Sequence, residues 1–222
     1  MQKFATTAPI ATVLDIPAGR VRLVAADRTD ATVEVRPADA AKSRDIKAAE
    51  QITVEYVDGV LRIAAAPAEN RVLGNSGSVE VTVQLPAGSR VEARTAAAEL
   101  RGVGRLGDVT FEGAQGTVEL DEAASAHLTL QAGGITIGRL TGPARISTRK
   151  GDLTITEAHH GSVELRTEHG EITIGAARGV SASLNAGTSH GRVDNALRNT
   201  DGAPALTVHA TTAYGNITAR SL

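Results

Sequence analysis

Residues 148–155 read Thr-Arg-Lys-Gly-Asp-Leu-Thr-Ile, and residues 167–174 read Thr-Glu-His-Gly-Glu-Ile-Thr-Ile. Both segments have a threonine three residues before a glycine and large apolar residues two and four residues after it. Side chains of a β-strand point alternately to opposite faces, so this alternation predicts a short strand with one buried face. Each segment is therefore expected to be a turn followed by a strand.

The glycine of this motif recurs along the chain at a nearly constant spacing. Successive differences are 17, 18, 19, 21 and 24 residues for Gly116, Gly133, Gly151, Gly170, Gly191 and Gly215, and Ala98 stands 18 residues before the first of them. Self-similarity at a fixed period indicates a repeat architecture. From about Val91 onward, the sequence predicts seven coils, each made of a strand, a turn and a second strand.

Four positions of the repeat are apolar in nearly every coil. Two residues after the reference position stand Leu100, Val118, Ile135, Leu153, Ile172, Val193 and Ile217, and four after it stand Gly102, Leu120, Ile137, Ile155, Ile174, Asn195 and Ala219. Five before it stand Ala93, Phe111, Leu128, Ile146, Leu165, Ala186 and Ala210, and seven before it stand Val91, Val109, Ala126, Ala144, Val163, Leu184 and Val208. The positions between these columns are polar, so the two kinds of column must face opposite sides of each strand.

A single coil cannot bury its own apolar face, so neighbouring coils are expected to stack about 4.8 Å apart around a continuous core. Residues 91–222 are thus predicted to form an all-β, single-stranded β-helix or solenoid of about seven coils. Threonines recur three residues before the reference position, at Thr95, Thr148, Thr167, Thr188 and Thr212. We expect them to form a structural ladder, while the longest connection, residues 195–205, is expected to be a projecting loop.

Residues 1–90 also show the period-2 alternation of strands. It runs through residues 13–16, 21–23, 33–35, 52–56 and 79–85, with Pro-Ala-Gly turns at 17–19 and 86–88. Residues 38–49 are good helix formers without alternation, so a short helix or a connection is expected near 38–50. This N-terminal β-meander is either a separate sandwich-like region or the first coils of the same stack, and a β-sandwich is the alternative fold class.

Composition excludes several function classes. The chain of 222 residues has no cysteine and no tryptophan, a net charge of -2, and only four aromatic residues. Thiolate metal sites and cysteine nucleophiles are therefore impossible, and nucleic acid is not expected as a partner because neither a basic surface nor a stacking platform is indicated. The absence of an apolar run of 18 residues argues against membrane insertion, and a cytoplasmic location is the default expectation.

The unit Thr-x-x-Gly-x-hydrophobic-x-hydrophobic, seen at 148–155 and 167–174, resembles the β-strand-repeat putative adhesins of bacteria. The resemblance covers most of the chain, including the N-terminal strands and their Pro-Ala-Gly turns. It implies a β-helix-like body, no agreed enzymatic activity and no catalytic residues to carry over. Members of that family are often secreted, membrane-anchored or associated with envelope stress responses.

One candidate metal site follows from the repeat. His169 and His190 both stand immediately before a reference glycine, in coils that follow one another in the sequence. Because these coils are expected to be adjacent and stacked about 4.8 Å apart, the two imidazoles could share a zinc ion, with Glu168 or Glu171 as a third ligand. Solvated side chains in a turn are the alternative interpretation. His159 and His160 precede Gly161 in a connection and are expected to be loop surface.

A second candidate is a column of charged residues that follow their glycines. Asp152, Glu171 and Arg192 could place two carboxylates side by side, the arrangement that acid–base catalysis uses, although Arg192 would neutralise them. An outward ladder of salt bridges is the alternative. Hydrolase, phosphate-loop and calcium-repeat motifs are missing from the sequence, so no catalytic residue and no cofactor is predicted.

The sequence therefore favours a non-catalytic scaffold or protein-interaction module rather than an enzyme. The coil 206–222 is predicted to end the stack without a cap, and uncapped strand edges favour association, so end-to-end self-association is expected. An envelope-stress sensor or an adhesin-like binding protein is one alternative function. An enzyme acting on polysaccharides through the charged column is another.

Overall fold

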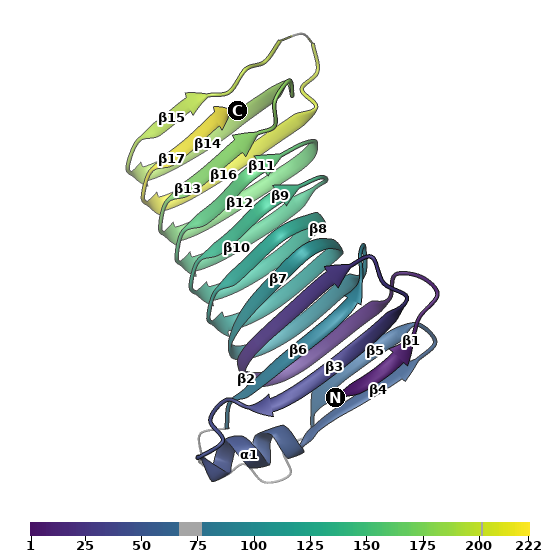
Figure 1. Ribbon diagram of the computed structural model, residues 1–222. Coiled ribbons are helices and arrows are strands. Elements are labelled where there is room, and N and C mark those ends of the chain that lie inside the picture. Colours follow the sequence, from purple (N-terminus) through teal and green to yellow (C-terminus); the bar gives the residue numbers. More distant parts are fainter. Residues whose placement is uncertain (67–76, 201) are drawn as a thin grey trace.

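The computed structural model describes residues 1–66, 77–200 and 202–222 and shows an elongated β-solenoid with one short helix at one end (Figure 1). The strands preceding residue 91 are β1 (Gln2–Ala5), β2 (Ala11–Ala26), β3 (Asp30–Pro37), β4 (Ile52–Val57), β5 (Val60–Ala65), β6 (Val79–Pro86) and the start of β7 (Arg90–Gln115). The remaining strands are β8 (Val118–Ala132), β9 (Ile135–Leu140), β10 (Ala144–Lys150), β11 (Leu153–Ala158), β12 (Gly161–His169), β13 (Ile172–Ala176), β14 (Ala182–His190), β15 (Val193–Ala196), β16 (Leu206–Tyr214) and β17 (Ile217–Ser221). The helix is α1 (Ser43–Glu50).

The predicted repeats stack as parallel strands in register. β8 pairs with β7 and β10, β10 pairs with β12, and β9 and β11 pair in the same way on the other side of the coil. Residues from the same column are direct partners, as for Ile135, Leu153 and Ile172. The all-β solenoid predicted from the glycine spacing is confirmed.

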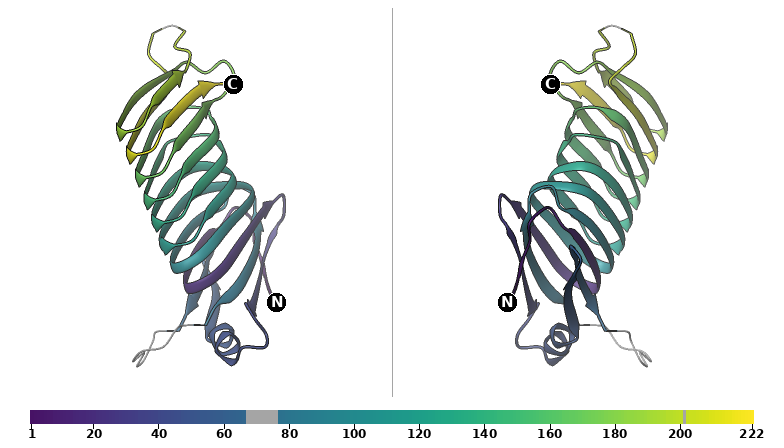
Figure 2. Two further views of the ribbon diagram at one scale, coloured as in Figure 1. Left: turned by 90° about the vertical axis from the view of Figure 1, so that its left-hand side faces the viewer. Right: turned by 90° about the vertical axis from the view of Figure 1, so that its right-hand side faces the viewer.

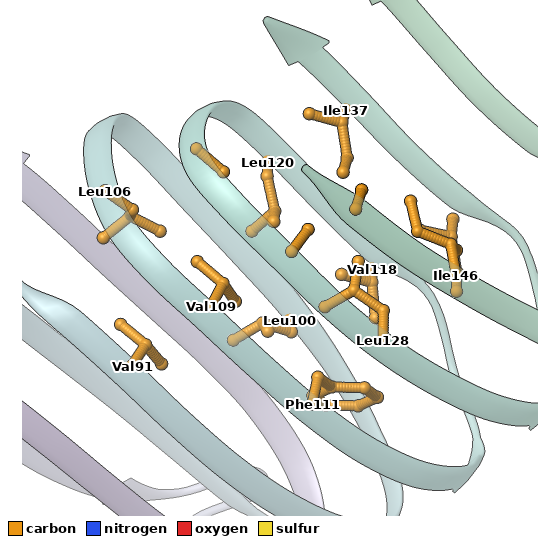
Figure 3. Packing of buried hydrophobic residues seen from close by; sticks show 14 of the residues in the cluster. Val91, Leu100, Leu106, Val109, Phe111, Val118, Leu120, Leu128, Ile137 and Ile146 are labelled. Atoms are coloured by element: carbon orange, nitrogen blue, oxygen red, sulfur yellow. The ribbon is translucent and has the colours of Figure 1, made fainter. Parts of the chain in front are cut away.

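The apolar columns form the interior of the stack. Ile135, Leu153 and Ile172 are each at most 1% exposed. Figure 3 shows side chains from successive coils, among them Val109 and Leu128, gathered between the two walls of strands. Burial of apolar side chains at roughly 1.5–3 kcal/mol each is the main term that holds neighbouring coils together.

Each reference glycine forms a corner where two coils approach closely. Gly151 has φ +149°, and a Cβ atom built on it would lie 2.0 Å from the carbonyl oxygen of Gly133 in the preceding coil. The threonine column completes the corner, since the Thr167 hydroxyl donates a hydrogen bond of 3.0 Å to the carbonyl oxygen of Gly151. Thr148, Thr188 and Thr212 make the equivalent bond to a glycine of the neighbouring coil.

The order of the last two coils differs from the sequence-based prediction. β16 lies between β12 and β14, and β17 lies between β13 and β15. The coil 206–222 is therefore internal, and the prediction that it ends the stack is wrong. The coil 182–196 stands at the end instead, because the connection 177–181 skips one coil position and the connection after β15 returns the chain to it. Residue 201 of that connection lies outside the described residues.

The N-terminal strands continue the same stack and then close it. β2 pairs in parallel with β7, so that Gly19 is the partner of Ala98 and residues 11–26 form a further coil. β5 and β6 both pair in parallel with β2. β3 then pairs antiparallel with β6, and β4 pairs antiparallel with β5. β1 pairs antiparallel with β3, and α1 packs nearby, within the predicted region 38–50 (Figure 2). Of these strands, only β4 and β5 form a simple hairpin.

Two aromatic residues lie at this closed end. The rings of Phe4 and Tyr56 pack against each other with centroids 5.4 Å apart, and both side chains contact the core. Across residues 1–66, 77–200 and 202–222, no helix has the length and hydrophobicity needed to span a membrane.

Candidate functional site

The C-terminal end of the solenoid differs from the rest because its last coil has a neighbour on one side only. β14 pairs with β16 and β15 pairs with β17, and neither has a second partner among the described strands. Val193 belongs to the same apolar row as Ile172 and Ile217, which are fully buried, but it is 45% exposed. All four residues of β15 are exposed. This end therefore presents two strand edges and part of an open apolar interior.

A stack of three rings lies beside this end, at the glycine corners. The Tyr214 ring lies between the imidazoles of His169 and His190, with centroid distances of 4.9 and 4.6 Å and interplanar angles of 9° and 10°. All three side chains are exposed, Tyr214 by 51%. The outer face of His190 is not covered by a further coil.

The ring stack corrects the geometry that was expected for His169 and His190. Their shared zinc site required directly adjacent coils, and this adjacency is wrong because β16 brings Tyr214 between them. Within the described residues, no group of three or more His, Cys, Asp and Glu side chains is placed to hold a metal ion. Glu168 lies 3.7 Å from the Arg149 guanidinium instead. The geometry thus gives no support to a metal shared by the two histidines.

The charged column is also interrupted by the inserted coil. Asn216 lies between Glu171 and Arg192, and its side-chain amide donates to Glu171 Oε1 over 3.2 Å. Asp152 Oδ1 accepts a hydrogen bond of 2.8 Å from the backbone N–H of Glu171, and Asn216 Oδ1 accepts one of 3.0 Å from the backbone N–H of Arg192. These side chains tie successive corners together, so they have a structural role in this fold.

His159 and His160 lie in the short connection between β11 and β12, as predicted. The backbone N–H of His159 donates to the Leu140 carbonyl over 3.0 Å, and its Nε2 lies 3.2 Å from Glu157 Oε1. Arg139 contacts the same carboxylate at 3.3 Å. The Arg139–Glu157 ion pair joins two neighbouring coils at the surface.

Ion pairs between coils cover the outer faces of the body. Arg101 binds Glu119 and Asp121 at 3.1 and 2.7 Å, and Arg145 binds Glu164 at 2.9 Å. These side chains are about half exposed, so each pair contributes about 0.2–1 kcal/mol at most. Where these pairs lie, the outer faces are consequently mixed in charge.

Sequence reasoning missed the terminal coil 182–196 and the role of Tyr214. The signal for Tyr214 was present, because it occupies the same column as the two histidines. The signal for the changed coil order was the spacing of 24 residues before Gly215, the longest in the series.

Comparison with models of known protein families assigns this chain to a family. A family model described as Toastrack DUF4097 matches residues 11–220. The chain belongs to this family. The match begins at β2 and runs through β17, so the Toastrack region includes β2 together with the later repeats. The resemblance inferred from the motif is confirmed.

Solved structures similar to this Toastrack chain come from several bacteria. A putative cell adhesion protein from Clostridium sporogenes is 11% identical, with a TM-score of 0.39 and coverage of 100% of this chain and 98% of that chain. A putative adhesin from Bacteroides fragilis is 14% identical, with a TM-score of 0.45 and coverage of 98% and 95%. A putative lipid binding protein from Parabacteroides distasonis is 9% identical, with a TM-score of 0.42 and coverage of 97% and 95%. No curated protein matches the chain.

Proposed function

We propose that this Toastrack protein is a non-catalytic interaction module that binds another protein through the C-terminal end of its solenoid. The observation that carries the proposal is the state of the last coil, in which β14 and β15 each lack a second strand and Val193 is 45% exposed. Strand edges beside an apolar surface bind protein by adding β-structure, since backbone hydrogen bonds supply affinity.

The interior and the outer faces support a scaffold rather than a catalytic cleft. The interior is filled by aliphatic side chains, and the carboxylates of Asp152 and Glu171 accept hydrogen bonds from neighbouring corners. A catalytic pair of carboxylates instead requires one group that is free to give or take a proton at substrate. The structural hydrogen bonds of Asp152 and Glu171 therefore support a non-catalytic role.

The proposal is tested by affinity capture from the native cell with matched variants at the two ends. Val193→Lys places a charge on the open end, whereas Val57→Lys makes the same change at a residue that is 64% exposed on β4, at the closed end. We expect proteins captured by the parent chain to be lost with Val193→Lys and retained with Val57→Lys. Equal capture by both variants would show that binding uses another surface.

The non-catalytic part has its own test. Purified protein is incubated with uronate polymers, and chain cleavage is followed by the appearance of new sugar ends. We expect no cleavage above a protein-free blank. Cleavage that disappears in Asp152→Asn or Glu171→Gln would overturn the non-catalytic assignment.

A further inference from the structure

The two ends of the solenoid are chemically different. At the N-terminal end, β3 pairs antiparallel with β6 and β4 with β5, and the packed rings of Phe4 and Tyr56 lie at the end of the core. β1 and β4 each have one partner among the described strands, but here the rings fill the space between them. At the C-terminal end, the connection after β15 covers only the start of β14, where the Ala182 N–H donates to the Arg198 carbonyl over 3.0 Å and Leu197 packs against the core. Among the described strands, none pairs with the outer edge of β14 or β15 (Figure 2). An occupant of this end must supply two strand edges, with apolar side chains between them. In this chain that combination is found at the same end of a second copy.

The charges of β15 are complementary to those of another β15. Arg192 and Asp194 lie on either side of Val193 and point away from the interior, and neither forms an ion pair with the described part of its own chain. If two β15 strands pair antiparallel about Val193, then Arg192 of each copy stands opposite Asp194 of the other. The two Val193 side chains then meet on the inner face.

We infer that the protein forms a dimer in which the C-terminal ends of two copies face each other, with β15 paired to β15 around a two-fold axis at Val193. The inference rests on the proposed function, because it names a second copy as the partner of that end. This contact resembles those within the solenoid, where oppositely charged residues on neighbouring coils are register partners. Arg101 and Glu119 are an example.

The two-fold symmetry of this contact limits the size of the assembly. A contact that uses the same surface on both copies is satisfied by two chains, because each copy has only one such surface. The assembly is thus a closed dimer, with twice the chain mass of 22.8 kDa, and it does not grow into filaments.

Charge reversal tests the arrangement, with sedimentation equilibrium of the full chain over a dilution series as the measurement. Asp194→Arg places two arginines opposite two arginines across the axis, and Arg192→Asp places aspartates opposite aspartates. We expect either variant alone to raise the dimer dissociation constant by roughly tenfold or more. An equimolar mixture of the two variants is expected to recover association, because each arginine then faces an aspartate. Both residues are exposed, so the variants are expected to retain the fold, and circular dichroism is the control for this.

Three outcomes overturn the inference: a parent chain that is monomeric at every concentration, a dimer that neither variant weakens, or a mixture that stays monomeric. In the first case the two charges protect the open edge instead of pairing it. A monomer that still loses its captured proteins with Val193→Lys would refute the second-copy partner and leave the proposed function standing. Equal capture by the Val193→Lys and Val57→Lys variants would refute the function itself.

Discussion

Glycine at the coil corners is required by both conformation and space. Apart from Gly191 and Ala98, the residues at the reference position have φ between +135° and +157°. Residues with a side chain rarely occupy this region. A methyl group there would also meet the backbone carbonyl of the coil before. Because parallel coils lie about 4.8 Å apart, that carbonyl cannot move away without breaking the strand pairing.

Replacing glycine with alanine should therefore destabilise the protein more at a corner than at an ordinary strand position. Gly151→Ala is expected to lower the free energy of unfolding by at least about 2 kcal/mol, measured by urea denaturation. Gly187→Ala is the matched control, because a Cβ on Gly187 meets nothing within 4 Å, and its effect should be about 0.5 kcal/mol or less. Similar losses for the two variants would mean that the corner does not need glycine.

Asp30 links the stability of the N-terminal end to pH. The Arg28 Nε donates to its carboxylate over 2.7 Å and the Lys3 ammonium lies 2.9 Å away, and these bonds lower the pKa of Asp30 from 3.8 to about 2. Since the folded-state pKa is the lower one, the stabilising contribution is complete above the unfolded value. It is lost as the pH falls through the interval down to about 2.

The Asp30→Asn variant should reproduce this loss at neutral pH. We expect the parent to be more stable than the variant above about pH 4.5, and the difference to shrink as the pH approaches about 2. Denaturant midpoints of both proteins at three pH values measure the effect. A difference that is constant over this range would show that the ion pairs with Lys3 and Arg28 make no net contribution.

At the scale of strands, the sequence predicts which residues share a row but not the order of the rows. Every coil carries the same alternation, so the β16–β17 coil fits between β13 and β15 as well as beyond β15. Only the length of the connections distinguishes the two orders, and a loop of nine residues after Ala196 permits both. The adjacency expected for His169 and His190 was wrong for this reason, whereas the rows through Ile135 and Leu153 did not depend on the order.

Engineered disulfides report the coil order directly, because the chain has no cysteine of its own. Thr173 on β13 is the register partner of Thr218 on β17, which in turn is the partner of Asp194 on β15. Cysteines at 173 and 218 should therefore cross-link under mild oxidation, since neighbouring parallel strands bring Cα atoms within about 6 Å. Cysteines at 173 and 194 are separated by a whole coil and should remain free. If the second pair cross-links and the first does not, the coils stack in the order of the sequence, with β15 next to β13.

At the scale of the molecule, the coil formed by β2 carries the repeat signal in its sequence, although it lies before the repeats predicted from Val91 onward. Leu14, Val21 and Leu23 stand at the same distances from Gly19 as the apolar columns do from later glycines, and Gly19 has φ +139°. The alternation within residues 1–90 is compatible both with a sandwich and with the first coils of the stack. The antiparallel strands that close the end depend on pairings between distant segments, such as β3 with β6, and alternation alone does not specify these partners.

A solenoid held together by contacts between neighbouring coils should open from its uncovered end. At concentrations where the chain is monomeric, amide hydrogen exchange within the strands β11 to β17 is expected to be fastest in β14 and β15, which have one partner each. β16 and β17 come later in the chain but lie between two coils, so their amides should exchange more slowly, with β11 to β13 slower still. Protection of β15 should then rise as the dimer forms, because pairing with the β15 of the second copy removes its free edge. Faster exchange in β17 than in β15 would contradict both the interior position of the last coil and the open end on which the dimer depends.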